Sequence, residues 1–286
     1  MVRDKCDQTT GIRYLERAGS GDAVVFLHGI GSSAASFRGL FDLMPPALRL
    51  IAWNAPGYGG SAALPEVWPL AARYAAVLHR FLTSIDAQRA VLVGHSLGTL
   101  IAAAYARCYP EQVPRIVLAA AACGYGLPTG APLPRKLAER IADLHRQGPA
   151  AFARARAPRL VHDPQANPGL VRQVETAMAA IHPAGYAQAV HMLASGDLVA
   201  ALRGVRCPVG FIIGAQDAVT PPEQTHRAAN AVEAAQGHAP PVVQIDGAGH
   251  AVYLQRPHAF AEALISLTAT HGTAHPAPTA TGGTHA

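Results

Sequence analysis

Charged residues are scarce in this chain, where they make up 14% of the 286 residues, against about 25% in an average soluble protein. Lysine is especially rare: Lys5 and Lys136 are the only two, so arginine supplies most of the basic excess behind the net charge of +5. That excess raises the question of a nucleic-acid partner. The arginines are dispersed, however, and no motif of basic and aromatic residues accompanies them, so we expect no nucleic-acid binding.

Long apolar runs are also missing. The longest, 116–123, is far short of the ~20 residues that cross a bilayer. The first eight residues are polar and contain no hydrophobic signal region, a pattern that argues against export. We therefore expect a cytoplasmic protein that has no membrane-spanning segment.

Cysteine is too sparse to build a framework. Cys6, Cys108, Cys123 and Cys207 lie far apart, and no Cys-x-x-Cys pair occurs. Widely spaced cysteines in a cytosolic chain are typical of reduced thiols rather than of disulfides or a zinc site. The sequence thus predicts neither a disulfide core nor a bound metal.

Short apolar segments alternate with alanine-rich stretches along most of the chain. Runs that are apolar throughout are typical of parallel strands covered on both faces, and their alternation with helices predicts an α/β fold with a doubly wound, mostly parallel sheet. The expected strands are 24–28, 50–53, 90–93, 116–118, 209–213 and 242–245. The expected helices between them are 70–84, 97–108, 223–236 and 259–269.

One interval interrupts this alternation. Residues 124–207 contain only helical pieces punctuated by proline, and so long an interval is not an ordinary loop. We expect residues 1–123 and 208–269 to form the core, and 124–207 to form a helical cap inserted over the sheet. Residues 270–286 contain little to bury, which predicts a disordered tail.

A Gly-x-Ser-x-Gly motif, residues 94–98, follows an expected strand and begins an expected helix. In this context the motif holds a serine on a sharp turn, and its glycines avoid collisions with the neighbouring backbone. The free N–H groups at the start of the helix then point toward charge that forms beside the serine. Ser96 is therefore the candidate nucleophile.

Five motifs that occur in order at strand ends resemble those of the α/β-hydrolase superfamily. The resemblance runs from about residue 11 to 268, nearly the whole chain, and implies the α/β-hydrolase fold. The motifs are His-Gly-Ile-Gly-Ser-Ser at 28–33, Asn-Ala-Pro-Gly-Tyr-Gly-Gly-Ser at 54–61, the Ser96 turn, Gly-Ala-Gln-Asp-Ala-Val-Thr-Pro-Pro at 214–222 and Gly-Ala-Gly-His-Ala-Val-Tyr-Leu-Gln-Arg-Pro at 247–257.

A serine hydroxyl needs a base, and histidine is the usual one. Among 14 histidines, His250 lies in a glycine-flanked loop after the last strand, whereas the side chain of His95 should diverge from that of its neighbour Ser96. Asp217, after the strand 209–213, is the candidate acid that orients the imidazole. Asp246 is more simply a turn residue. The order Ser96, Asp217, His250 is that of the triad of this fold.

The oxyanion hole is expected to use backbone N–H groups. Leu97 follows the nucleophile and is the first donor, and the resemblance implies Ile30 as the second. The expected reaction is a two-step acyl transfer that needs no metal and no organic cofactor. Its substrate is a small molecule, a carboxylic ester or a lactone, and the protein is expected to be a monomer or a homodimer.

Other functions of the same fold stay open. The resemblance includes hydrolases of C–C bonds in ring-cleavage products, although many of these have Gly-Pro-Gly in the first loop and Trp after the histidine, where this chain has Gly-Ser-Ser at 31–33 and Ala251. A ligand receptor without turnover, or an acyltransferase, would also keep the triad.

The expected cap is rich in basic residues, namely Arg135, Lys136, Arg140, Arg146, Arg154, Arg156, Arg159 and Arg172. Long charged side chains favour solvated surfaces, so we interpret them mainly as surface charge. The alternative is that they attract a substrate that carries a carboxylate.

Overall fold

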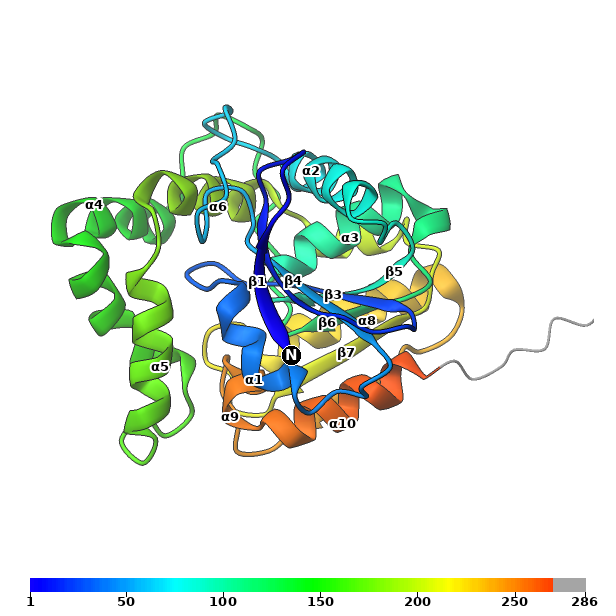
Figure 1. Cartoon of the computed structure of the whole chain (residues 1–286). Coiled ribbons are helices and arrows are strands. Elements are labelled where there is room, and N and C mark those ends of the chain that lie inside the picture. The colour runs from blue at the N-terminus through cyan, green and yellow to red at the C-terminus, as the bar shows by residue number, and fades with distance from the viewer. Residues whose placement is uncertain (270–286) are drawn as a thin grey trace, which may run out of the picture.

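The computed structural model of the chain describes residues 1–269 (Figure 1). The predicted tail, 270–286, lies outside the described residues. One sheet of eight strands forms the centre, in the order β1-β2-β4-β3-β5-β6-β7-β8. The strands are β1 (Val2–Cys6), β2 (Arg13–Arg17), β3 (Ala23–Leu27), β4 (Arg49–Trp53), β5 (Ala90–His95), β6 (Ile116–Ala119), β7 (Val209–Gly214) and β8 (Val242–Ile245).

The six strands from β3 to β8 are those predicted from their apolar runs, and neighbours among them pair in parallel. The sequence analysis missed β1 and β2, which form an antiparallel hairpin at the edge of the sheet. Their charged residues interrupt any apolar run, and most of β1 is exposed. Antiparallel edge strands with a solvated side do not need continuous hydrophobicity.

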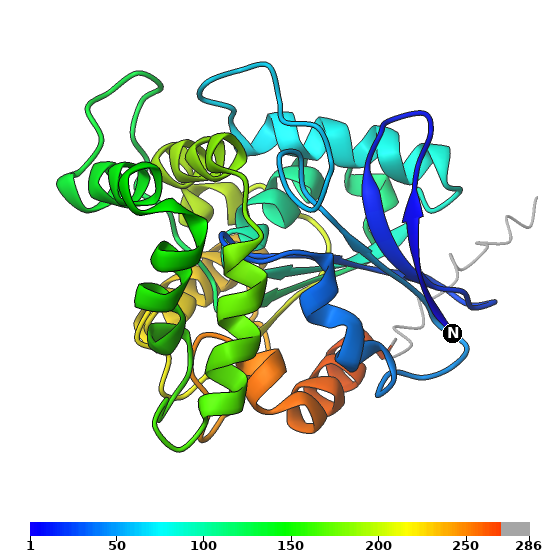
Figure 2. The ribbon, with the colours of Figure 1, turned by 60° about the vertical axis from the view of Figure 1, so that its left-hand side comes forward.

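Helices cover both faces of the sheet (Figures 1 and 2). In β3, Val25 and Leu27 pack into a core shared with α2 (Ala71–Ser84), α3 (Gly98–Cys108) and α8 (Pro222–Gln236). Val24 and Phe26, on the opposite face, pack into a second core with the other helices. These are α1 (Arg38–Phe41), α9 (Val252–Gln255) and α10 (Pro257–Thr268). The predicted fold class, a mostly parallel sheet with helices on both sides, is confirmed.

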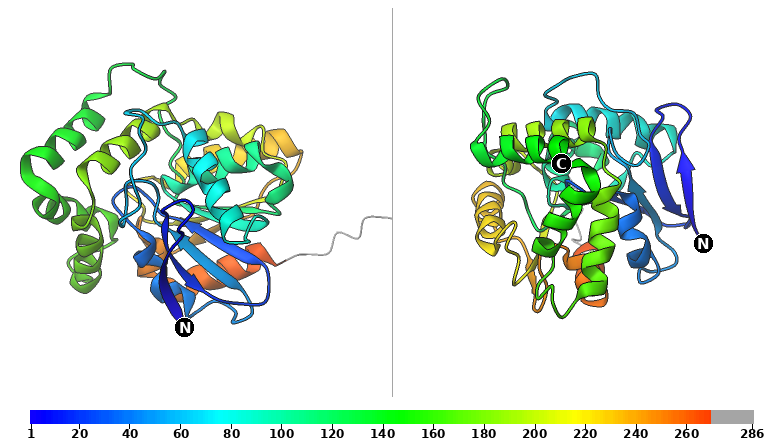
Figure 3. Two further views of the ribbon diagram at one scale, coloured as in Figure 1. Left: turned by 45° about the horizontal axis from the view of Figure 1, so that its top comes forward. Right: turned by 90° about the vertical axis from the view of Figure 1, so that its left-hand side faces the viewer.

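Residues 124–207, which we call the helical segment, contribute no strand to the sheet within the described residues. All but the last of their helices lie together at one end of the sheet, as Figure 1 and the left-hand view of Figure 3 show, and the last packs against α3 and α8. The helices are α4 (Arg135–Arg156), η3 (Ala157–Leu160), α5 (Pro168–Ala179), α6 (Pro183–Ser195) and α7 (Leu198–Leu202). Gly148, at φ 75°, breaks α4 just before Pro149 and so turns its second half.

The strand order places a switch in direction at the centre of the sheet. From β3 the chain moves outward to β4, then returns past β3 to form β5 on its other side. The loops that follow β3 and β5 therefore diverge from adjacent strands, and in open α/β sheets ligands bind in the crevice at such a point. No helix among residues 1–269 is both long enough and apolar enough to cross a membrane.

Candidate active site

Ser96 occupies a strained turn between β5 and α3. Its φ is 52°, a left-handed value that is uncommon for a residue other than glycine and is often found at functional sites. The flanking glycines permit the turn, because a Cβ on Gly94 would lie 2.6 Å from the carbonyl oxygen of Gly98. A Cβ on Gly98 would lie 2.1 Å from that of Leu27. The spacing of the motif thus follows from close packing of the turn.

His250 and Asp217, on the loops after β8 and β7, form a buried pair. The His250 Nδ1 lies 2.8 Å from Asp217 Oδ2. Burial opposes ionisation of Asp217, but His250 and the amides of Thr220 and Val219 outweigh it and lower the Asp217 pKa. An ionised carboxylate only accepts hydrogen bonds, so His250 Nδ1 carries the proton. The other nitrogen, Nε2, is then left with its lone pair free to act as a base.

Thr220 completes this pair, and the sequence analysis missed it. Its hydroxyl lies 2.8 Å from Asp217 Oδ2, 3.2 Å from His250 Nδ1 and 3.0 Å from the carbonyl oxygen of Ala120. Its amide also donates to Asp217 Oδ1. The Asp-x-x-Thr spacing, in which an aspartate accepts from amides two and three residues on, is the only local signal for this role.

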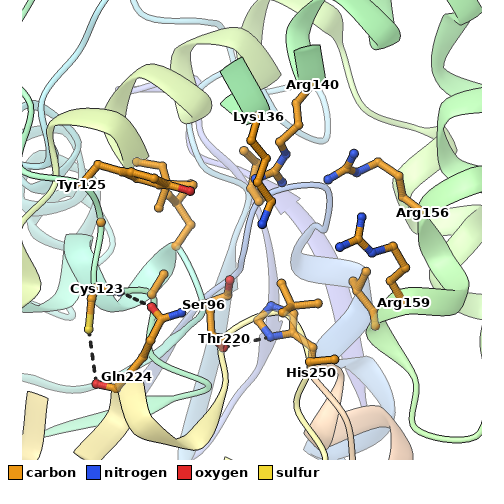
Figure 4. Close-up of a pocket in the computed structure, with 18 of the residues that line it drawn as sticks. Ser96, Cys123, Tyr125, Lys136, Arg140, Arg156, Arg159, Thr220, Gln224 and His250 are labelled. Carbon is orange, nitrogen blue, oxygen red and sulfur yellow. Dashed lines mark hydrogen bonds between the residues drawn. The ribbon is translucent and has the colours of Figure 1, made fainter. Parts of the chain in front are cut away.

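Ser96 and His250 line the same cavity, which has a volume of about 360 Å³ (Figure 4). Within residues 1–269, no hydrogen bond joins the Ser96 hydroxyl to the imidazole. Such catalytic contacts are often long without substrate and tighten in the complex. Ile30 and Leu97 also line the cavity, and neither amide donates to another group among the described residues. The structure therefore brings all five predicted residues to one place.

Two further buried histidines hold the loops of this site through hydrogen bonds to the backbone. His95 Nε2 lies 2.9 Å from the carbonyl oxygen of His250, which can only accept, so His95 donates there. His28 Nε2 accepts from the Ala55 amide, which links the loops after β3 and β4. Burial lowers the pKa of His95 to about 3 and that of His28 to about 4. Both rings are therefore neutral supports, and the His95 side chain is directed to the His250 main chain.

Seven of the eight basic residues named for the expected cap fall into two groups, and the eighth, Arg172, is exposed outside the cavity. Lys136, Arg140, Arg156 and Arg159 line the cavity, together with Arg227 from α8. Figure 4 shows the first four opposite Ser96 and His250. By contrast, Arg135, Arg146 and Arg154 pair with carboxylates. Surface charge is thus a sufficient interpretation only for the second group.

The described residues contain no group of three or more His, Cys, Asp or Glu side chains arranged to hold a metal ion. Asp246, the other aspartate near the histidine in sequence, is exposed. Cys123 is buried in the cavity wall, where its thiol donates to the carbonyl oxygen of Gln224.

The sequence matches the profile of the alpha/beta hydrolase family over residues 24–263. This chain belongs to that family, as the motifs and the fold indicate. A pimeloyl-[acyl-carrier protein] methyl ester esterase of Aromatoleum aromaticum is 31% identical over 251 residues, covering 82% of this chain and 93% of that protein. An uncharacterized protein of Mycobacterium tuberculosis is 33% identical over 109 residues, 38% of this chain, and that match spans 32% of its length.

Solved structures with similar folds include an enol-lactonase from Burkholderia xenovorans and an esterase from Thermogutta terrifontis. The enol-lactonase has a TM-score of 0.80 at 20% identity, over 93% of this chain and 99% of its own. The esterase has a TM-score of 0.77 at 22% identity, over 93% and 97%. At these identities the likeness establishes the fold alone.

Proposed function

We propose that this protein is a serine hydrolase that cleaves a small carboxylic ester or lactone, with Ser96, His250 and Asp217 as its triad. One observation carries the proposal. The Asp217–His250 pair fixes the imidazole proton on Nδ1, which leaves Nε2 as the base in the same cavity as the strained Ser96. The esterase relative in Aromatoleum aromaticum, matched over most of both chains, supports the choice of an ester.

The reaction proceeds in two balanced steps. His250 Nε2 takes the Ser96 proton while the oxygen attacks the substrate carbonyl, and the tetrahedral intermediate collapses as the imidazolium returns the proton to the leaving alcohol. Water then attacks the acyl-serine, gives its proton to His250, and releases the acid as Ser96 recovers its hydrogen. Asp217 stabilises the imidazolium in both steps.

The negative oxygen of each tetrahedral intermediate is stabilised by the backbone. The Ile30 and Leu97 amides supply the two donors, and the start of α3 adds its positive dipole end. A serine hydrolase gains much of its rate from such fixed donors, since losing one costs about 10²–10³-fold. Residues 124–207 form a cap that closes the cavity over this centre.

Replacing the nucleophile tests the proposal. The wild-type protein should hydrolyse p-nitrophenyl butyrate and be labelled at Ser96 by a fluorophosphonate, detected by peptide mass spectrometry. Ser96→Ala should lose the label and reduce kcat by about 10⁶-fold. Ser84→Ala, which changes a serine of α2 outside the cavity, is the matched control and should keep both. Retention of most of the rate by Ser96→Ala would contradict the proposal.

Hydrolysis of a C–C bond is the second candidate. A 2-hydroxy-6-oxononadienedioate/2-hydroxy-6-oxononatrienedioate hydrolase of Escherichia coli is 26% identical over 148 residues, half of this chain and 51% of that protein. A screen of esters, lactones and ring-cleavage diketones separates the two candidates by their kcat/KM. Turnover of none of these would favour a receptor, and product formed with an added alcohol would reveal an acyltransferase.

A further inference from the structure

Five cationic side chains line the cavity, and no aspartate or glutamate among the described residues does. They come from three elements: Lys136, Arg140 and Arg156 from α4, Arg159 from η3, and Arg227 from α8. Lys136 and Arg140 are four residues apart and so share one face of the helix. The break at Gly148 turns the second half of α4, which lets the two ends of one helix contribute to the same wall.

None of these five cations forms an ion pair with a carboxylate among residues 1–269. Neighbours on the same helix do: Arg135 pairs with Glu139 at 3.0 Å, and Arg146 pairs with Asp143. Arg154, two residues before Arg156, lies 3.6 Å from Glu175 of α5. Arginines of the helical segment outside the cavity thus form ion pairs with carboxylates, whereas the five cations that line the cavity do not.

Aromatic rings hold two of the cavity guanidinium groups without neutralising them. Arg140 Nε donates to the Tyr186 hydroxyl at 3.2 Å, and its guanidinium lies 5.8 Å from the centre of that ring. The Arg156 guanidinium lies 5.1 Å from the centre of the Phe152 ring. Both rings are almost completely buried and pack edge to face against each other. Stacking on aromatic faces orients an arginine but leaves its N–H donors available.

These cations also repel one another. Burial, followed by the charge of Arg140, holds the pKa of the Arg156 guanidinium below its usual value, and Arg159 acts in the same direction. Because arginine stays protonated at ordinary pH, such repulsion raises the energy of the empty site. An anion that enters the cavity relieves this repulsion.

The size of the cavity limits which anion can enter. A volume of about 360 Å³ lies at the lower end of the ~300–1,000 Å³ typical of small-molecule sites. A nucleic acid or an acidic protein segment does not fit beside Ser96 in that space. The anion must therefore belong to a small molecule, and the substrate is the one that occupies the cavity during turnover.

We propose that the ester or lactone carries an oxyanion group, a carboxylate or a phosphate, and that Arg140 and Arg156 bind it opposite Ser96. This inference rests on the hydrolase function proposed above. Arginine suits the task because its planar fork donates two parallel hydrogen bonds to either group. Lys136, Arg159 and Arg227 add charge around the two arginines.

The central experiment compares charged and uncharged versions of one ester. For the wild-type protein, kcat/KM for mono-p-nitrophenyl adipate should exceed that for its primary-amide analogue by at least about 10-fold, the lower range for hydrogen bonds to a charged group. Arg156→Gln and Arg140→Gln should each lower kcat/KM for the adipate ester about 10- to 100-fold and leave the amide nearly unchanged. Arg156→Lys, which keeps the charge and loses the fork, should fall between.

Matched controls remove the same charge elsewhere on the helical segment. Arg146→Gln and Arg172→Gln lie outside the cavity and should preserve the preference for the adipate ester. 4-Acetoxybenzoate, compared with 4-acetoxybenzamide, repeats the test with the carboxylate on the alcohol side. Equal kcat/KM for charged and uncharged substrates on both sides would overturn the inference, as would an equal loss in the control variants.

A binding measurement separates this inference from the proposed hydrolase function. Calorimetry with the Ser96→Ala protein should show adipate or inorganic phosphate binding in the cavity, and the additional change Arg156→Gln should weaken it at least about 10-fold. Stronger binding of phosphate than of adipate would assign the oxyanion as phosphate. If the wild-type protein hydrolyses neither ester yet binds these anions, the hydrolase proposal fails and the anion site stands. If neither anion binds although the neutral ester is hydrolysed, the anion site is wrong.

Discussion

The two walls of the cavity differ in how their polar groups are partnered. On the sheet side, Asp217 accepts hydrogen bonds from Thr220, Val219 and His250, and His95 holds the His250 main chain. On the side of the helical segment, Arg140 and Arg156 rest on aromatic rings and meet no carboxylate among the described residues. The Asp217–His250 pair of the first wall is held by hydrogen bonds within the protein, whereas the two arginines of the second wall have no carboxylate partner among the described residues.

This difference separates two tasks. A buried network of hydrogen bonds is rigid, which suits groups that must stay positioned while charge develops in a transition state. Unpaired cations gain stability only when an anion arrives, which suits selection between substrates. Changes to the sheet-side wall should therefore affect all substrates alike, and changes to the other wall should affect only anionic ones.

Apart from loss of the nucleophile, the largest effect is expected from Asp217. Asp217→Asn removes the negative partner of His250 and lets the imidazole adopt the wrong tautomer, so kcat should fall about 10⁴-fold, as in the comparable triad. The measurement is kcat on the butyrate and adipate esters. The control is Asp246→Asn, which replaces an exposed aspartate four residues before His250 in the sequence. This variant should have little effect on kcat. A loss under about 10-fold for Asp217→Asn would mean that another group orients the base.

The second prediction is that acid lowers the unfolding free energy of the protein through two buried histidines of the sheet-side wall. His28 and His95 are neutral in the folded protein, with pKa values of about 4 and about 3, while an unfolded histidine takes a proton below about pH 6.5. The unfolded state therefore binds more protons, and stability falls as pH drops from about 6.5 toward about 4. Each histidine should cost about 2 kcal/mol of unfolding free energy between pH 7 and pH 5.

Urea unfolding at the two pH values measures this loss. His95→Gln retains a donor for the His250 carbonyl but cannot titrate, so its unfolding free energy should change by about 2 kcal/mol less than that of the wild type over the same range. His258→Gln, which replaces an exposed histidine of α10 that does not line the cavity, is the matched control for a histidine-to-glutamine change. An unaltered dependence in His95→Gln would show that this ring is not a neutral support.

The smallest effect is expected at Thr220, which acts through Asp217. Thr220→Val preserves the shape and removes one hydroxyl, so kcat should fall about 3- to 10-fold, the usual value of a single hydrogen bond. Thr220→Ser, which keeps the hydroxyl, should restore most of the rate, whereas a packing role alone would leave valine near the wild-type rate and serine below it. Parallel kcat measurements on the wild type, Thr220→Val and Thr220→Ser distinguish a hydrogen-bonding role from a packing role.

Much of the architecture could be predicted because parallel strands leave a strong signal. Strands such as β5 are apolar on both faces, and the glycines around Ser96 mark a turn that admits no Cβ. The edge strand β1 gave no such signal, because its exposed side chains resemble those of a loop. In β2 the middle residues are buried, but charged residues interrupt the apolar run. The candidate triad followed from its positions after three strands.

What could not be predicted depends on contacts between distant segments. The hydroxyl of Thr220 reaches Ala120 and His250 only once β6, β7 and β8 lie in order. Arg140 and Arg156 share a wall only because Gly148 breaks their helix and Tyr186 arrives from α6. In the sequence these arginines look the same as Arg146 and Arg154, which face other partners.

The separation of tasks is tested most directly by the ratio of kcat/KM for mono-p-nitrophenyl adipate to that for its amide analogue. In Asp217→Asn both values should fall together, so the ratio should equal that of the wild type. In Arg156→Gln the ratio should fall at least about 10-fold, because only the charged ester loses a partner. A ratio that changes in Asp217→Asn, or that stays constant in Arg156→Gln, would contradict the account.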